Sequence, residues 1–259
     1  MPVIVGTSGW MYDDWRRVLY AGLPRRLWLE RYAECFDTVE NNNAFYRLPS
    51  VGTFQDYRDR TPETFVMAVK ASRFLTHIKR LKDPAEPVER LLRAADGLGA
   101  KLGPILLQLP PTLQADPDRL DGCLRCFPAA VRVAVEPRHV SWWVTEVREV
   151  LERRGAALCW ADRLGRPQAP LWRTTDWAYV RFHEGAAHPR PAYGDRALSA
   201  WVRRIEGTWG DDDDVYSFFN NDVGGAAVHD AARFADLARA AGRHVTRTPA
   251  TAHQGVSSR

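Results

Sequence analysis

The chain has 259 residues, of which 45% are hydrophobic and 26% charged, so its composition is that of a globular protein able to bury a large core. Its formal net charge of +4 is too mild to indicate a nucleic-acid partner and is compatible with an anionic substrate. The N-terminus lacks a basic segment followed by an apolar run, and no run approaches the roughly 20 residues of a membrane span. We therefore expect no signal peptide, no membrane contact and a cytoplasmic setting.

Eight short apolar stretches run along the chain, and nearly every one ends in polar or charged residues. The body of a parallel strand packs in the core of a barrel, while its carboxyl end opens toward the site, so the repeated pattern predicts a parallel barrel. The predicted strands span residues 3–10, 38–46, 65–72, 104–110, 132–139, 157–163, 178–184 and 215–221.

Helical segments alternate with these strands, which favours an α/β fold with a parallel sheet. Asp, Ser and Pro at the starts and Gly at the ends mark several helix boundaries. The predicted helices span residues 27–36, 50–60, 83–97, a segment opening at 116–117, 143–154, 198–205 and 226–241.

One segment departs from an ideal barrel. Residues 165–176 contain two prolines and no helical face, so we expect an irregular segment after strand six. We predict a single TIM (β/α)8-type domain over residues 1–242, a solvated acidic turn at 211–214, and a polar, disordered tail over 243–259.

Four cysteines are too few for a disulfide scaffold in a chain of this length. Cys123 and Cys126 form a C-x-x-C pair, but no second pair and no nearby His cluster supports a zinc site. We expect a structural role for both.

Polar residues at the carboxyl ends of different strands converge on one cavity in a parallel barrel. Burying acids and bases together is costly unless they pair or meet a ligand, so the cluster is either a salt-bridge network or a functional site, and we favour function. The candidates are Ser8, Trp10, Glu40, Asn42, Tyr46, Lys70, Thr76, His77, Gln108, Glu136, Arg138, His139, Asp162, Arg181, His183, Asn220, Asn221 and Asp222.

Four of these residues are predicted to be catalytic. Glu136 is the strongest candidate, because the proline that follows it restricts it to an extended conformation at the strand end. Glu40 is either a general base or an ion-pair partner of Lys70 or Arg181. His183 can shuttle protons near neutral pH. Lys70 can bind phosphate as a point charge or act as a nucleophilic amine.

Substrate binding is assigned to polar and aromatic side chains around these four. Arg offers a planar fork for phosphate or carboxylate, and Asn offers hydrogen bonds to ligand hydroxyls. The predicted substrate-binding residues are Arg181, Arg138, Tyr46, Asn42, Gln108, Asn220, Asn221 and Trp10. No nucleotide-cofactor motif is present. A divalent metal stays open as a cofactor, with Glu40, Glu136, Asp162, His139 and His183 as candidate ligands.

Seven segments together resemble the YecE-like family, the "domain of unknown function seventy-two" proteins. They are GTSGWMYDDW (6–15), FDTVENNNAFYRLP (36–49), FVMAVKASRFLTH (65–77), ILLQLPP (105–111), VAVEPRHVSW (133–142), YVRFH (179–183) and VYSFFNND (215–222). The resemblance implies a TIM barrel whose biochemical activity is not established. It places Glu40, Asn42, Tyr46, Lys70, Gln108, Glu136, Arg138, Arg181, His183, Asn220 and Asn221 at signature positions. Asn41 and Glu184 depart from the family pattern, which has a hydrophobic residue and a glycine there.

Three functions fit this sequence. The first is an enzyme of hydrolase or lyase/isomerase type that acts on a small anionic or phosphorylated metabolite, with Glu136 or Glu40 as acid or base and Arg181 and Lys70 holding the anion. The second is a metal-dependent nucleic-acid processing enzyme. The cationic side chains Lys70, Arg138 and Arg181 among the candidate ligands weaken this hypothesis, because they repel a metal ion at close range. Its predicted nucleic-acid contacts are Arg17, Arg25, Arg26 and Arg73 to phosphates and Trp10 or Tyr46 to a base. The third is a non-catalytic binding module that uses the same pocket.

Overall fold

Ten strands form one sheet in the computed structural model, which describes residues 2–250. The sheet order is β6-β5-β4-β3-β2-β1-β10-β9-β7-β8. The strands are β1 (Val3–Ser8), β2 (Thr38–Asn41), β3 (Val66–Lys70), β4 (Leu102–Gln108), β5 (Val133–Glu136), β6 (Ala157–Leu158), β7 (Trp160–Arg163), β8 (Arg166–Pro167), β9 (Ala178–Phe182) and β10 (Val215–Phe219).

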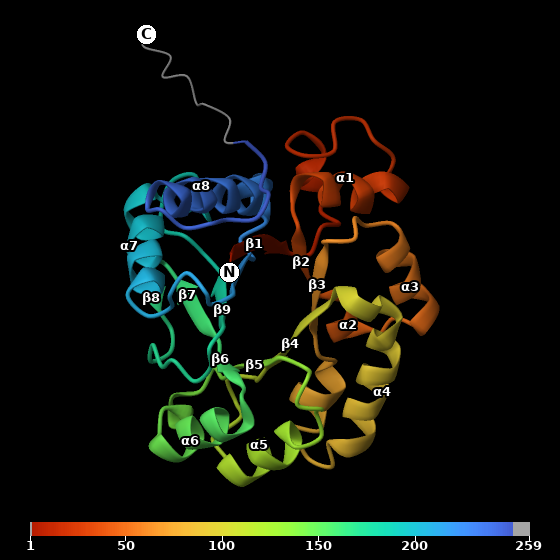
Figure 1. Ribbon diagram of the computed structural model, residues 1–259, viewed down its shortest axis with the longest axis vertical. Coiled ribbons are helices and arrows are strands. Elements are labelled where there is room, and N and C mark those ends of the chain that lie inside the picture. The colour runs from red at the N-terminus through yellow and green to blue at the C-terminus, as the bar shows by residue number, and fades with distance from the viewer. Residues whose placement is uncertain (1, 251–259) are drawn as a thin grey trace.

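Every pairing between these strands is parallel except that of β7 with β8. Only Cys159 separates β6 from β7, yet β6 pairs with β5 and β7 pairs with β9. The result is a barrel-like arrangement with strands around the middle and helices outside them (Figure 1). The predicted α/β fold with a mostly parallel sheet is therefore confirmed.

The helices connect successive strands. They are α1 (Trp28–Cys35), α2 (Asn43–Tyr46), α3 (Val51–Asp59), α4 (Ala85–Ala95), α5 (Pro117–Leu124), α6 (Thr145–Arg154), α7 (Asp195–Glu206) and α8 (Ala226–Ala240), with short 3₁₀ or π turns at Asp13–Arg16, Arg25–Leu27, Phe74–Ile78, Asp96–Lys101, Val140–Trp142 and Val223–Gly225. Ser50 and Asp116 cap α3 and α5 by accepting the amide hydrogens of Thr53 and Arg119. Gly155 ends α6 with a left-handed φ of 60°.

Alternation along each strand divides the core into two parts. One face of each strand packs against the surrounding helices, and the other points into the barrel-like interior. Small side chains on several strands leave room there for large ones on β9 and β10. The interior apolar cluster is Ile4, Ala68, Leu106, Ala134, Ala157, Cys159, Ala161, Trp177, Tyr179, Tyr216 and Phe218.

The second strand is shorter than the predicted 38–46. It ends at Asn41, whose Oδ1 accepts the amide hydrogens of Asn43 and Ala44 at 3.0 and 3.4 Å. This side chain satisfies the free amides at the start of α2, so the chain turns into a short helix and the strand cannot continue.

The segment after strand six contains no helix, as predicted. It forms β8 and then a loop that covers β6 and β7 where a helix would otherwise lie. Trp160 Nε1 donates to the carbonyl of Trp172 at 3.0 Å, and Thr174 Oγ1 accepts the amide of Leu158 at 2.9 Å. These bonds hold the loop against the outer face of the strands.

The prediction of a disordered tail from residue 243 is wrong for its first part. Val245 forms a parallel bridge with Val3, and the buried Arg243 donates to the carbonyls of Trp209 and Gly210 at 2.7 and 2.9 Å. The rest of the predicted tail, residues 251–259, lies outside the described residues.

The acidic run 211–214 forms a turn, as predicted, with its first two residues exposed. Its last two residues are half-buried and make ion pairs at the amino ends of the strands. Asp214 pairs with Arg132 at 2.6 Å, and Asp213 pairs with Arg173 at 3.3 Å. Among residues 2–250, no helix is long and apolar enough to cross a membrane.

Candidate functional site

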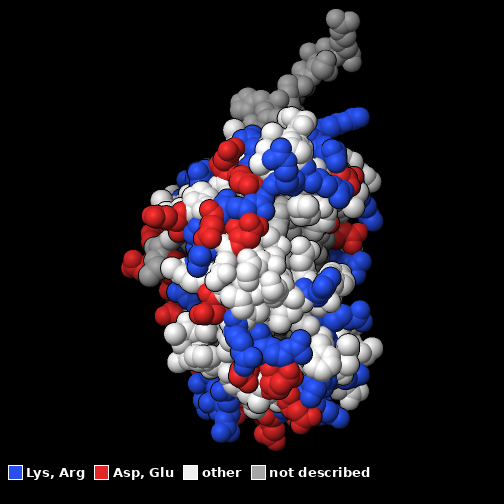
Figure 2. All heavy atoms as spheres, turned by 90° about the vertical axis from the view of Figure 1, so that its right-hand side faces the viewer, with Lys and Arg blue, Asp and Glu red and all other residues white. Residues whose placement is uncertain are grey.

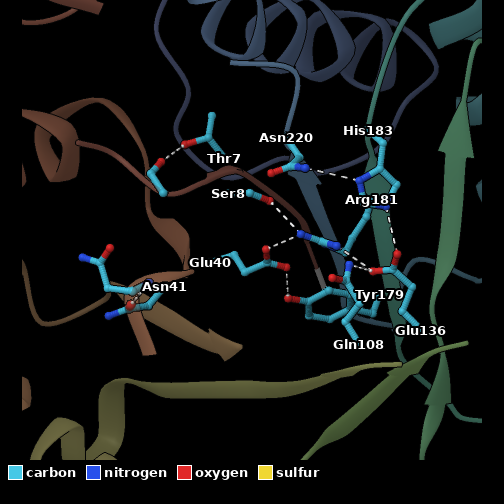
Figure 3. Close-up of polar contacts among 12 residues, drawn as sticks. Thr7, Ser8, Glu40, Asn41, Gln108, Glu136, Tyr179, Arg181, His183 and Asn220 are labelled. Carbon is cyan, nitrogen blue, oxygen red and sulfur yellow. Dashed lines mark hydrogen bonds and ion pairs between the residues drawn. The ribbon is translucent and has the colours of Figure 1, made fainter. Parts of the chain in front are cut away.

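Arg181 lies at the centre of the polar cluster at the carboxyl ends of the strands. It projects inward from β9 and is 1% exposed. Its Nη1 donates to Glu136 Oε2 at 2.6 Å, and its Nη2 donates to Glu40 Oε1 at 2.7 Å. Figure 3 shows the guanidinium between the two carboxylates, which come from β5 and β2. One arginine therefore joins three strands.

Each of these carboxylates has further donors. Tyr179, two residues before Arg181 on the same face of β9, donates its hydroxyl to Glu40 Oε2 at 2.6 Å. Gln108 Nε2 donates to Glu136 Oε2 at 2.9 Å from the neighbouring register position on β4. Both carboxylates are thus almost fully hydrogen-bonded within the protein.

The other oxygen of Glu136 faces a second pair of cationic or polar groups. Arg138 Nε donates to Glu136 Oε1 at 3.0 Å, and His183 Nε2 lies 3.0 Å from the same oxygen. Asn220 Nδ2 lies 3.3 Å from His183 Nδ1. His183 is therefore held at both ring nitrogens, by an acid on one side and an amide on the other.

The electrostatics follow from burial and these contacts. Burial alone would raise the pKa of Glu136, but the charges of Arg181, His183 and Arg138 hold it well below its usual value. For His183, burial outweighs the attraction of Glu136 and lowers the pKa of the imidazole. Glu136 is consequently a fixed negative charge, a weak base, and a poor acceptor for a substrate proton.

A cavity of about 520 Å³ opens above this network. We call it the central cavity. Three cations line it, Lys70, Arg138 and Arg181, against a single carboxylate, Asp222. Its other lining residues are Gly9, Trp10, Met11, Tyr12, Asn42, Asn43, Tyr46, Gln108 and Asn220. The central cavity is polar and carries an excess of positive charge.

Lys70 is the cation in this wall that lacks a counter-ion. It ends β3, is 9% exposed, and its Nζ lies 4.1 Å from the centre of the Phe45 ring. Across residues 2–250, no hydrogen bond or ion pair holds this ammonium group. Burial, reinforced by the charge of Arg181, lowers its pKa to about 8.

Asp222 is the carboxylate that faces the central cavity. Burial raises its pKa to about 6, and its Oδ1 is buried without a hydrogen-bond partner among the described residues. Tyr12 also lines the cavity, and its hydroxyl donates to the carbonyl of Ser8 at 2.6 Å. A carboxyl group with this pKa can exchange protons near neutral pH.

A second cavity of about 480 Å³ lies on the other side of Arg138 and Asn220, which line both. We call it the side cavity. Its wall includes Glu136, His183 and Glu184, together with Pro111, Pro137, Ala161, Arg163 and Gln168. Glu184, one of the departures from the family pattern, pairs with Arg163 at this rim at 3.0 Å.

Ten of the twelve residues predicted as catalytic or substrate-binding meet here. They are Glu40, Glu136, His183, Lys70, Arg181, Arg138, Gln108, Asn220, Asn42 and Trp10. Tyr46 is 74% exposed and lies at the rim of the central cavity. Asn221 points the other way, and its Nδ2 donates to Asp230 Oδ2 at 2.6 Å.

Several candidates are used in packing instead. Asp162 accepts from Tyr193 and Trp201 at 2.6 and 2.7 Å on the helix-facing side of β7. His139 caps the turn that follows β5 by accepting the amide of Ser141. Thr76 and His77 bond to each other at 2.9 Å outside the network.

Of the five candidate metal ligands, Glu40, Glu136 and His183 lie in the network, and Asp162 and His139 lie outside it. Within residues 2–250, no three His, Cys, Asp or Glu side chains are arranged to hold a metal ion. Glu40 and Glu136 do approach one another, but Arg181 occupies the space between them, and a cation there repels a metal. The four cysteines are free thiols, Cys123 and Cys126 among them.

Sequence reasoning missed Tyr179 and Tyr12. The signal for Tyr179 was present, because it precedes Arg181 by two residues and therefore shares its face of the strand. Tyr12 lies in a loop after β1, and its hydroxyl donates to the carbonyl of Ser8 at 2.6 Å. No periodicity in the sequence predicts that contact.

The chain is similar to proteins of one family. A family model described as "Protein of unknown function DUF72" matches residues 4–254. The chain is 23% identical to the UPF0759 protein YunF of Bacillus subtilis (strain 168) over 91% of its length and 94% of that protein. A DUF72 family protein from Thermotoga maritima MSB8 is 29% identical with a TM-score of 0.79, covering 92% of this chain and all of that one. Another from Enterococcus faecalis V583 shares the fold at 18% identity and a TM-score of 0.76, covering 95% of this chain and 98% of its own.

Proposed function

The chain belongs to the DUF72 family, as its sequence resemblance predicted, and we propose that it is an enzyme acting on a small anionic substrate in the central cavity. We also propose that the sheet is a TIM (β/α)8-type barrel in which β6 and β7 together form one of eight strands. Active sites of such barrels lie at the carboxyl ends of the strands, where this cavity is.

The observation that carries the proposal is the unbalanced charge of the cavity wall. Arg181 has two carboxylate partners, and Arg138 has one. Lys70 has none among the described residues, although burying an unpaired ammonium group is costly. A phosphate or carboxylate group would supply the missing counter-charge and would accept hydrogen bonds from the lysine.

The structure suggests a division of roles different from that expected of Glu136 and Glu40. Both are saturated by donors, so we assign them to positioning Arg181 and His183. Asp222, which lines the cavity and has a pKa of about 6, is the better group for proton transfer. Asn42 also lines the cavity, where its side-chain amide can hydrogen-bond to a ligand hydroxyl.

The nucleic-acid hypothesis has weaker support. Of its four predicted phosphate contacts, Arg25 is paired with Asp13 and lies over the Trp28 ring. On the face shown in Figure 2, basic and acidic side chains are intermingled around a central uncharged area. A phosphate-binding track would concentrate one sign of charge.

We propose a cytoplasmic location, which four free thiols would suit.

Phosphate-dependent stabilisation tests the proposal. Inorganic phosphate at millimolar concentration should raise the Tm of the wild-type protein, because a ligand that binds only the folded state stabilises it by about 2.7 kcal/mol at 100 times its Kd. Lys70→Gln should lose most of this shift. Lys82→Gln, which removes an exposed lysine, is the matched control and should keep it.

Two outcomes would contradict the proposal. Equal shifts in Lys70→Gln and the wild type would mean that phosphate binds elsewhere. The absence of any shift with phosphate, pyrophosphate or small carboxylates would remove the evidence for an anion site. Anion binding without turnover in a screen of phosphorylated and carboxylated metabolites would favour the binding-module hypothesis over the enzyme.

A further inference from the structure

We propose that Lys70 is a nucleophile, whose amine condenses with the carbonyl carbon of a small anionic aldehyde or ketone held in the central cavity. This inference rests on the proposed function, since it names the substrate class of the same cavity. It adds the reactive amine, the second role that the sequence left open for this lysine, to the charge that holds the anion.

The surroundings of Lys70 are those of a reactive amine. A lysine that serves only to hold the fold is normally paired when it is buried. Lys70 is 9% exposed and lies on the cavity wall, with its Nζ over the face of Phe45, 4.1 Å from the ring centre. An aromatic ring stabilises an ammonium ion less than a carboxylate does, so the cost of protonating this amine stays high.

The positive charge of Arg181 also favours the neutral form of the Lys70 amine. Burial and the Arg181 guanidinium lower the pKa of Lys70 to about 8. Arg181 itself cannot give up its proton, because its two carboxylates hold its pKa well above the ordinary value against the effect of burial. At pH 7.5 a lysine of pKa about 8 holds on the order of 100 times more neutral amine than an ordinary lysine.

The choice of lysine over arginine at this position supports the inference. The chain has 36 Lys and Arg residues, and only Lys70, Lys79, Lys82 and Lys101 are lysines. Arginine binds phosphate and carboxylate through a planar fork, and this chain uses it for nearly every cation, including two in the same cavity. Arginine cannot be deprotonated in a protein, so it cannot provide a neutral amine.

The covalent step balances without a further reactant. The lone pair of Lys70 Nζ forms a bond to the carbonyl carbon, the π pair of the C=O bond moves to oxygen, and one proton passes from nitrogen to that oxygen to give a carbinolamine. A second proton, from a carboxyl group, then reaches the oxygen, the carbon–oxygen bond breaks, one water leaves, and the nitrogen lone pair forms the C=N bond of an iminium ion that keeps one N–H. Asp222 lines the same cavity and can move these protons. The iminium ion accepts the electron pair of a bond to the adjacent carbon and becomes a neutral enamine, so the reaction class is proton removal or bond cleavage at that carbon.

Reductive trapping in the intact protein tests the inference. The wild type is incubated with pyruvate at pH 7.5, reduced with sodium borohydride, and digested, and the lysine peptides are quantified by mass spectrometry. The expected result is a carboxyethyl amine on Lys70 that forms at least about ten times faster than on the exposed Lys82, given the larger neutral fraction. Inorganic phosphate should slow labelling of Lys70 and leave Lys82 unaffected.

A variant and a binding measurement separate this inference from the proposed function. Lys70→Arg keeps the cation and removes the nucleophile. Its Tm should therefore still rise with phosphate, by about as much as the wild-type Tm does, while the adduct is lost. If Lys70 labels no faster than Lys82 while phosphate still stabilises the protein, Lys70 is only a charge and the inference is overturned. If neither labelling nor stabilisation occurs, both proposals fail. Because labelling is measured in the wild type, a variant that does not fold leaves the test valid.

Discussion

Arg181 bridges Glu136 and Glu40, with one guanidinium nitrogen 2.6 Å from the first carboxylate and the other 2.7 Å from the second. All three residues are at most 1% exposed. The arrangement joins β9, β5 and β2 at the floor of the central cavity, so this buried triad serves first to hold three strand ends in register. The two carboxylates expected to be catalytic are consequently the least available in the site.

Removing Arg181 should therefore be severely destabilising. Arg181→Met leaves two buried carboxylates without their main partner, and breaking a buried pair in this way costs about 3–5 kcal/mol. Urea unfolding at pH 7 measures the loss. Arg233→Met is the control, since its pair with Asp195 is largely exposed and should be worth about 0–1 kcal/mol. Equal losses in the two variants would show that the buried triad contributes no more than a surface pair.

Lowering the pH should reduce the free energy of unfolding through the protonation of Glu136. Its pKa in the folded state lies well below the ordinary value of 4.5, because Arg181, His183 and Arg138 outweigh burial. The unfolded chain therefore takes up the proton first, and stability that is complete above about pH 4.5 falls as the pH drops through the folded-state pKa.

Comparing unfolding free energies of the wild type and Glu136→Gln between pH 7 and pH 2.5 checks this dependence. Glutamine keeps the shape and one hydrogen-bond acceptor but cannot titrate, so the variant should be less stable at pH 7 and should approach the wild type in acid. Parallel curves over the whole range would contradict the assignment of a low pKa to Glu136.

The cluster of polar strand ends could be predicted because the carboxyl ends of parallel strands lie on the same side of a barrel. Which side chains actually meet depends on alternation along each strand. Glu40, Glu136 and Arg181 continue the inward-facing series of their strands, whereas Asp162 and Asn221 belong to the opposite, helix-facing series. Applying the period of two to each candidate would have separated these groups from the sequence alone.

Other features had no signal in the sequence. Tyr12 and Asp222 line the same cavity although they are 210 residues apart, and no local pattern specifies that they meet there. Nor does composition reveal that Arg243 is buried, because a polar terminal segment normally lies in solvent. Both depend on tertiary packing, which places a polar side chain beside unpaired carbonyls or carboxylates.

Asp162 should prove structural. Its two oxygens accept from Tyr193, Trp201 and the amide of Gly165, which are all donors. Asp162→Asn turns one of these oxygens into a donor and leaves a buried N–H without an acceptor, at a cost of about 1–3 kcal/mol. Urea unfolding should detect this loss, and the rise in Tm with phosphate should be unchanged. A variant of full stability that no longer responds to phosphate would place Asp162 in the site.

Lys70 should lower the free energy of unfolding of the protein at pH 7. Its folded-state pKa of about 8 lies below the ordinary 10.5, so at pH 7 folding must bury a charge that the unfolded chain holds freely in water. Lys70→Met should therefore be more stable than the wild type at pH 7, by on the order of 1–3 kcal/mol. The unfolded chain binds more protons between about pH 8 and 10.5, so the wild type should gain stability across that interval and the difference should shrink. Lys82→Met reports the general effect of losing a lysine. A Lys70→Met protein that is less stable than the wild type at every pH would mean that the ammonium group is stabilised in the fold, and the reactive amine would lose its physical basis.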